Sequence, residues 1–128
     1  MLGQGSRIFG VATDDGHPIY HHCKGWVMVN AENNVNAILK ALEQGAFYSS
    51  TGPEIYDFYV KDGKAVIECA PAKMIRLHCD CHPTRLHRAE DGQALTRAEF
   101  DVSGYPYARI TVIDEQGRFA WTNPIFLD

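Results

Sequence analysis

The chain has 128 residues, which is the size of one domain with its own hydrophobic core. A hydrophobic content of 45% and a charged content of 22% are typical of a globular protein, and no apolar stretch reaches the roughly 18 residues of a membrane span. The net charge of −4 argues against nucleic acid or an anionic membrane as the main partner. The first residues lack the apolar core of a signal peptide, and the four cysteines lack the spacing of a disulfide scaffold, so we expect a cytoplasmic protein with free thiols.

The first predicted element is a buried strand over residues 8–12, a short apolar run that leads directly into two carboxylates, a glycine and an imidazole. Asp15 and His17 carry ligand types that suit Zn²⁺, Mn²⁺ or Fe²⁺. Gly16 between them allows the backbone to turn so that both side chains can point the same way. The pair is only part of a site, because catalytic zinc normally takes three protein ligands.

A polar loop over residues 18–25 follows, and a short apolar strand is expected over residues 26–29. His21, His22 and Cys23 in this loop are candidate ligands beside the Asp15–His17 pair. We favour a solvated loop instead, because consecutive residues seldom face one ion and their spacing matches no standard metal site.

The spacing of apolar residues predicts a single helix, which begins after Asn33 or Asn34 and ends at Gly45. Its apolar stripe, at i, i+3, i+4 and i+7, consists of Val35, Ile38, Leu39 and Leu42. An asparagine can cap the start, and a glycine in the left-handed conformation can close the end. We expect the stripe to pack against the protein core.

The segment after the helix, residues 47–55, is predicted to be a loop. Ser49, Ser50 and Thr51 precede Gly52 and could meet a phosphate or carboxylate. The alternative is a turn whose hydroxyls bond to its own backbone. We favour the turn, because no helix N-terminus follows to complete an anion site.

From residue 55 onward the apolar residues alternate with polar ones, and turn signals recur at short intervals. The Asp62-Gly63 pair predicts a tight hairpin, and Asp91-Gly92 predicts a second turn. About six or seven short strands of this kind indicate an antiparallel β-sandwich, with Trp121 buried in an apolar strand. The expected fold class is therefore α+β, mostly an antiparallel β-sandwich preceded by a strand–loop–strand–helix segment.

Residues 78–82, His-Cys-Asp-Cys-His, place five potential metal ligands in a row. Strand alternation divides them, since Cys79 and Cys81 would face inward and the three polar side chains outward. No second ligand pair lies at zinc-finger spacing. We therefore expect buried, free, metal-free thiols rather than a structural metal.

Several stretches together resemble one branch of the PHP superfamily (polymerase and histidinol phosphatase) of metal-dependent hydrolases. In that family a final Asp-x-His closes a multinuclear metal site at the mouth of a distorted (βα)₇ barrel. The stretch that resembles this motif is residues 10–17. The stretches that resemble the rest of the branch, including its C-terminal β-sandwich, are residues 25–29, 45–53, 107–112 and 120–126.

The resemblance implies that Asp15 and His17 are the closing metal ligands, whereas Asp14 precedes them without an assigned ligand role. His21, His22 and Thr51 are further candidate site residues. It also implies a parent enzyme that hydrolyses a small phosphoester or related ester with divalent Zn, Mn or Fe. The remaining ligands, beginning with an early His-x-His, would lie in an N-terminal barrel portion that is the missing partner.

The domain organisation expected from this resemblance has three parts. Residues 1–24 are a remnant of the barrel-type domain, residues 25–53 hold a strand, the helix and the Thr-Gly-Pro loop, and residues 54–128 form the sandwich. We expect the chain alone to be inactive and to hold no metal tightly. Two other functions stay open, a non-catalytic β-sandwich module for binding or interaction and a small metal-binding protein.

Overall fold

A computed structural model of the chain describes residues 2–80 and 85–127, so Cys81 and His82 of the predicted ligand cluster lie outside the described residues. Two short 3₁₀ turns, η1 (Leu2–Gln4) and η2 (Ile19–His21), precede the first strand, and α1 spans Val35–Gln44. The strands are β1 (Trp26–Val29), β2 (Phe47–Ser50), β3 (Ile55–Lys61), β4 (Lys64–Ala72), β5 (Met74–His78), β6 (Arg85–Arg88), β7 (Leu95–Asp101), β8 (Tyr107–Ile113), β9 (Phe119–Thr122) and β10 (Ile125–Phe126). Within the described residues, no helix has both the length and the apolar character that crossing a membrane requires.

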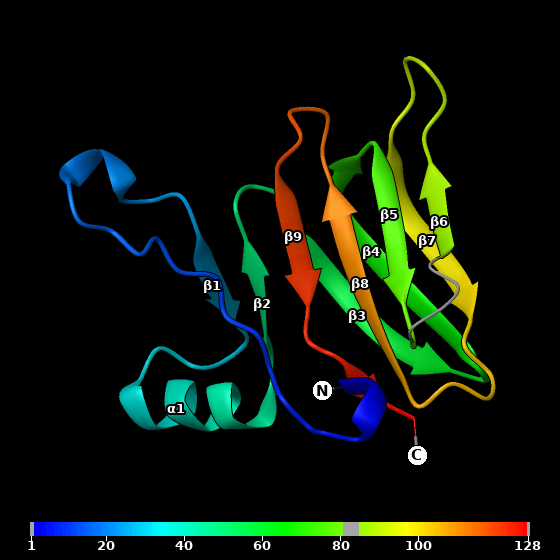
Figure 1. Cartoon of the computed structure of the whole chain (residues 1–128), viewed down its shortest axis with the longest axis horizontal. Coiled ribbons are helices and arrows are strands. Elements are labelled where there is room, and N and C mark those ends of the chain that lie inside the picture. Colours follow the sequence, from blue (N-terminus) through cyan, green and yellow to red (C-terminus); the bar gives the residue numbers. More distant parts are fainter. Residues whose placement is uncertain (1, 81–84, 128) are drawn as a thin grey trace.

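The strands form two antiparallel sheets that face each other (Figure 1). The larger sheet has the order β1-β2-β9-β8-β5-β6, with β10 paired to β8, and the smaller sheet has the order β3-β4-β7. This arrangement confirms the expected α+β, mostly antiparallel sandwich. Since β1 and β2 pair into the sheet of β8 and β9, the expected units 25–53 and 54–128 share one sheet.

From residue 55 onward the described residues contain eight strands, β3 to β10, against the six or seven expected. Before it, β2 was expected to be part of a loop and instead pairs between β1 and β9. In the sandwich the strand that was not expected is β6, whose sequence Arg-Leu-His-Arg has no apolar alternation. It is a strand because its backbone pairs with β5 at the sheet edge, a tertiary contact that side-chain pattern does not reveal.

The hydrophobic core lies between the two sheets. Its fully buried side chains alternate along the strands as predicted, and the largest of them are Ile67 on β4, Ile75 and Leu77 on β5, and Ile110 and Val112 on β8. The predicted Asp62-Gly63 hairpin is confirmed, because β3 and β4 pair across it and both turn residues have positive φ, 51° and 73°.

The prediction of a buried strand over residues 8–12 is wrong. The segment is extended but unpaired, and Ile8, Phe9 and Val11 are 43%, 36% and 63% exposed. Side chains hold it in place instead of a neighbouring strand. Ser49 Oγ accepts from the Ala12 N–H and donates to the carbonyl oxygen of residue 10. An apolar run favours burial, but here the larger sheet covers the segment only in part, where Phe9 meets Phe47 on β2 and Phe126 on β10.

Helix α1 confirms the predicted ends, because the Asn34 side chain accepts from the Ala37 N–H at 2.9 Å and Gly45 has φ of 73°. The prediction that its stripe packs into the core is wrong. Ala41 is the buried residue of the helix, while Val35 and Leu39 are 72% and 54% exposed. Figure 1 shows the reason, since α1 lies to one side of the sandwich, below β1 and β2.

Trp121 is half-buried and not part of the core, so its predicted placement is also wrong. Strand alternation on β9 sends Ala120, with no exposed surface, toward the core and Trp121 to the opposite face of the larger sheet. There its ring stacks on Phe119 with 5.5 Å between centroids.

Candidate functional site

Asp14 is the anchor of the loop that carries the candidate metal ligands. Its carboxylate accepts three backbone N–H groups, from Cys23 and Lys24 at 2.6 Å each and from Gly25 at 2.7 Å. These hydrogen bonds, chiefly those from Gly25 and Lys24, lower the pKa of Asp14. The carboxylate thereby ties the two ends of the loop together just before β1.

Asp15 and His17 lie beyond this anchor, on a loop that projects away from both sheets (Figure 1). Asp15 has φ of 45°, the left-handed conformation that aspartate tolerates better than most residues. His17 Nδ1 lies 3.0 Å from the Asp15 backbone oxygen. Since a carbonyl oxygen can only accept, Nδ1 is the donor in this contact, which leaves Nε2 as the ring nitrogen that could bind a metal. Histidines that bind metals are commonly oriented by such a bond.

The other two histidines of this loop, His21 and His22, each pack against a neighbouring residue. The His22 ring lies against Gly16, with its Nε2 3.5 Å from the position that a Cβ there would take. The His21 ring packs edge-on against Tyr20, 4.7 Å between centroids. Within the part of the chain that the structure describes, no three histidine, cysteine, aspartate or glutamate side chains are grouped to hold a metal ion. The loop thus presents a pair of ligands and not a complete site.

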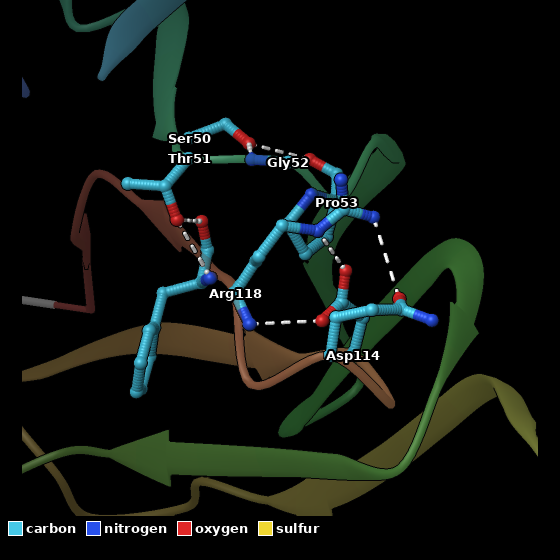
Figure 2. A network of polar contacts seen from close by, with 8 residues as sticks. Ser50, Thr51, Gly52, Pro53, Asp114 and Arg118 are labelled. Carbon is cyan, nitrogen blue, oxygen red and sulfur yellow. Dashed lines mark hydrogen bonds and ion pairs between the residues drawn. The ribbon is translucent and has the colours of Figure 1, made fainter. Parts of the chain in front are cut away.

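The Thr51 hydroxyl is used in hydrogen bonds between the β2–β3 loop and the start of β9. Its hydroxyl donates to the Phe119 carbonyl oxygen at 3.2 Å and accepts the Phe119 N–H at 2.9 Å. Nearby, the Ser50 hydroxyl donates to the Pro53 carbonyl oxygen and accepts the Gly52 N–H (Figure 2). The Ser50 hydroxyl thus serves the backbone of its own turn, as the favoured interpretation expected, whereas the Thr51 hydroxyl bonds the backbone of β9 and the Ser49 hydroxyl bonds the segment 8–12.

The turn between β8 and β9 contains an ion pair that the sequence analysis did not identify. Arg118 Nε donates to Asp114 Oδ2 at 2.7 Å, and the Arg118 N–H donates to Oδ1 at 2.8 Å. Burial opposes ionisation of Asp114, but these bonds and the arginine charge outweigh it and lower its pKa. Figure 2 shows the Arg118 side chain between Asp114 and Gly52. A Cβ at residue 52 would lie 2.6 Å from Arg118 Nε.

The outer face of the larger sheet carries a second group of polar residues, which includes His78 of the predicted ligand cluster. His78 on β5 lies opposite Arg109 on β8, and its Nε2 is 3.1 Å from the Thr111 hydroxyl. Burial, followed by the positive charges of Arg109 and Arg76, lowers the pKa of His78 to about 4. The signal was present in the alternation of β5 and β8, which places these polar side chains on one face.

The cysteines of the described residues are free, as expected. Cys69 and Cys79 are buried in the core, and Cys23 is exposed. Burial raises the pKa of both buried thiols, that of Cys69 to about 11. These two thiols therefore act as small hydrophobic side chains of the core.

Comparison with protein-family models, with curated proteins and with solved structures found no match for this chain. The likeness to the PHP superfamily therefore depends on the sequence stretches alone.

Proposed function

We propose that this chain is the C-terminal part of a metal-dependent hydrolase of phosphoesters or related esters, with Asp15 and His17 as two ligands of the metal site. The observation that carries the proposal is the orientation of His17, whose Nδ1–H is bound to the Asp15 carbonyl and whose Nε2 is left available. The Asp15 carboxylate is on the same exposed turn. An imidazole and a carboxylate suit Zn²⁺, Mn²⁺ or Fe²⁺.

Each residue of the loop has a distinct role in this proposal. Asp14 fixes the loop through three backbone N–H groups and is not a ligand. Asp15 supplies a carboxylate, and His17 supplies a ring nitrogen whose direction is set by the hydrogen bond to the Asp15 backbone oxygen. A divalent metal ion bound there would activate water for attack and stabilise the charge that develops on the ester.

The rest of the ligand set would come from an N-terminal barrel portion of the same protein. The exposed apolar surface supports this partner, because most of the exposed large hydrophobic side chains come from residues 8–39. They are Ile8, Phe9, Val11, Ile19, Tyr20, Trp26, Met28, Val35 and Leu39. Exposed apolar side chains mark an interface where they form one contiguous patch, which is what this proposal requires of residues 8–39. Among the described strands, β1 is also the edge of the larger sheet on this side.

Manganese binding tests the ligand assignment directly. Electron paramagnetic resonance of Mn²⁺ titrated into the chain should show weak binding that is lost in Asp15→Ala and in His17→Ala. His21→Ala is the matched control, because it removes an imidazole from the same loop and should change nothing. Equal Mn²⁺ binding by the chain and its Asp15→Ala variant would contradict the assignment.

An activity assay tests whether the site is complete in this chain. With Mn²⁺ or Zn²⁺ and a generic aryl phosphate, we expect no turnover above background, since two ligands hold a metal too weakly for catalysis. Turnover that disappears in Asp15→Ala would show that this chain already holds a full site, and the proposed division between two portions would be wrong.

A non-catalytic interaction module is the second candidate function, and the same exposed apolar residues of 8–39 favour it. The two functions differ in their dependence on metal. Association with a partner that persists in EDTA and in the Asp15→Ala, His17→Ala double variant, with no metal bound by the complex, would favour the interaction module.

A further inference from the structure

A cleft of about 660 Å³ lies between the N-terminal segment and the ends of β8 and β9. This volume is within the range of small-molecule sites, roughly 300–1,000 Å³. One wall is the extended segment 8–12, and the opposite wall includes Trp121 and Arg109 on the outer face of the larger sheet. The cleft is separate from the Asp15–His17 pair, neither of which lines it.

The apolar part of the cleft is open to a ligand. Ile8 and Val11 on the N-terminal side are exposed, although both are large hydrophobic residues. Trp121 across from them is half-buried and adds a flat aromatic surface. A flat apolar group between these walls would remove hydrophobic surface from water, which is favourable.

Most polar groups that line the cleft are already satisfied by the protein. The Ser49 hydroxyl bonds to residues 10 and 12, and the Thr122 hydroxyl accepts the Ile110 N–H. Asn123 accepts the N–H of residue 10 and donates to the carbonyl oxygens of Gly45 and Phe47. These groups shape the cleft but have little capacity left to bind a ligand.

Arg109 is the exception. It is the charged side chain among the described residues that line the cleft, and its Nε is buried without a hydrogen-bond partner in that part of the chain. None of the ion pairs found between described residues includes it. Because the buried Nε has no accessible surface, a ligand in the cleft would meet the exposed part of this half-buried side chain, and an acceptor there would offset the cost of the unpaired charge.

We propose that this cleft binds a small carboxylate with a flat apolar body, its carboxylate paired to the Arg109 guanidinium and its body against Trp121. The planar guanidinium presents two parallel N–H donors that match the two oxygens of a carboxylate. The positive charge of Arg76, which lies near the same face, also favours an anion. The site does not depend on the proposed metal function.

Phenylacetate is a suitable probe, and Trp121 fluorescence a suitable signal. Trp26→Phe leaves Trp121 as the single tryptophan, since the chain has two. EDTA in the buffer keeps metal out, so failure here is distinct from failure of the metal proposal. Phenylacetate should bind, whereas phenylacetamide, which lacks the charge, and acetate, which lacks the ring, should each bind roughly tenfold or more weakly.

Variants in the same background assign the binding to this cleft. Arg109→Gln should weaken phenylacetate binding roughly 10–100-fold, the effect of losing a charged hydrogen-bond pair. Arg97→Gln is the matched control on the smaller sheet and should leave affinity unchanged. If Arg109→Gln does not fold, Val11→Asp replaces it, because Val11 is 63% exposed and a carboxylate there would compete for Arg109.

Three results would overturn the proposal. The first is equal affinity for phenylacetate and phenylacetamide. The second is acetate binding as tightly as phenylacetate, which would indicate an adventitious ion only. The third is unchanged phenylacetate affinity in folded Arg109→Gln or in Val11→Asp.

Discussion

At the scale of single residues, Asp14 shows how one carboxylate can order a loop that has little packing of its own. Its two carboxylate oxygens accept hydrogen bonds from the backbone N–H groups of Cys23, Lys24 and Gly25. Asp14→Ala should therefore speed amide hydrogen exchange at these three residues, because their N–H groups lose their acceptor. Asp15→Ala is the control, since it removes the adjacent carboxylate and should leave this exchange unchanged. Equal protection in all three proteins would contradict the anchoring role.

His78 gives a second prediction at this scale, a dependence of stability on pH. Its folded pKa of about 4 is below the ordinary value of 6.5. Between these values the unfolded chain binds a proton that the folded chain does not, so the free energy of unfolding falls as pH falls from about 6.5 to about 4. His78 is partly exposed, so the loss should be on the order of 1–2 kcal/mol. Urea denaturation should show a flatter pH dependence for His78→Asn, and parallel curves for the two proteins would contradict the assignment.

At the scale of elements, the contact between the β2–β3 loop and the β8–β9 turn depends on Arg118. A methyl group at Gly52 would meet the Arg118 side chain and displace it from Asp114. Gly52→Ala should therefore cost about 1 kcal/mol in urea denaturation, the upper end for an ion pair whose arginine is half exposed. The cost should largely vanish in an Arg118→Ala background, because the displaced contact no longer exists. Fully additive costs in the double variant would show that the two residues are not coupled.

At the scale of the whole molecule, stability comes from the core between the sheets and not from helix α1. Leu77 on β5 is fully buried, and Leu39 on α1 is 54% exposed. Leu77→Ala should lower the free energy of unfolding by about 2–5 kcal/mol, because it leaves a cavity. Leu39→Ala should change it by less than about 0.5 kcal/mol. Equal costs for these matched substitutions would mean that the helix stripe is covered in solution.

The sequence by itself determined the features that depend on neighbouring residues. Alternation along β4, β5 and β8 predicted which side chains enter the core, and Asp62-Gly63 predicted its hairpin. Asn34 and Gly45 predicted both ends of α1. These signals are local, because the strand period, the turn conformation and the helix caps each involve a few consecutive residues.

Only the tertiary structure decided which surfaces were available to bury those residues. The apolar run 8–12 and the stripe of α1 have the pattern of buried elements, yet neither joins the core, because both lie outside the space between the two sheets and are covered only in part. β6 is a strand through pairing alone. Likewise, Asp14 meets N–H groups nine to eleven residues away, and Arg109 faces a cleft formed by the distant N-terminal segment. Hydrophobicity and charge favour burial or pairing, but the partner is set by how the whole chain packs.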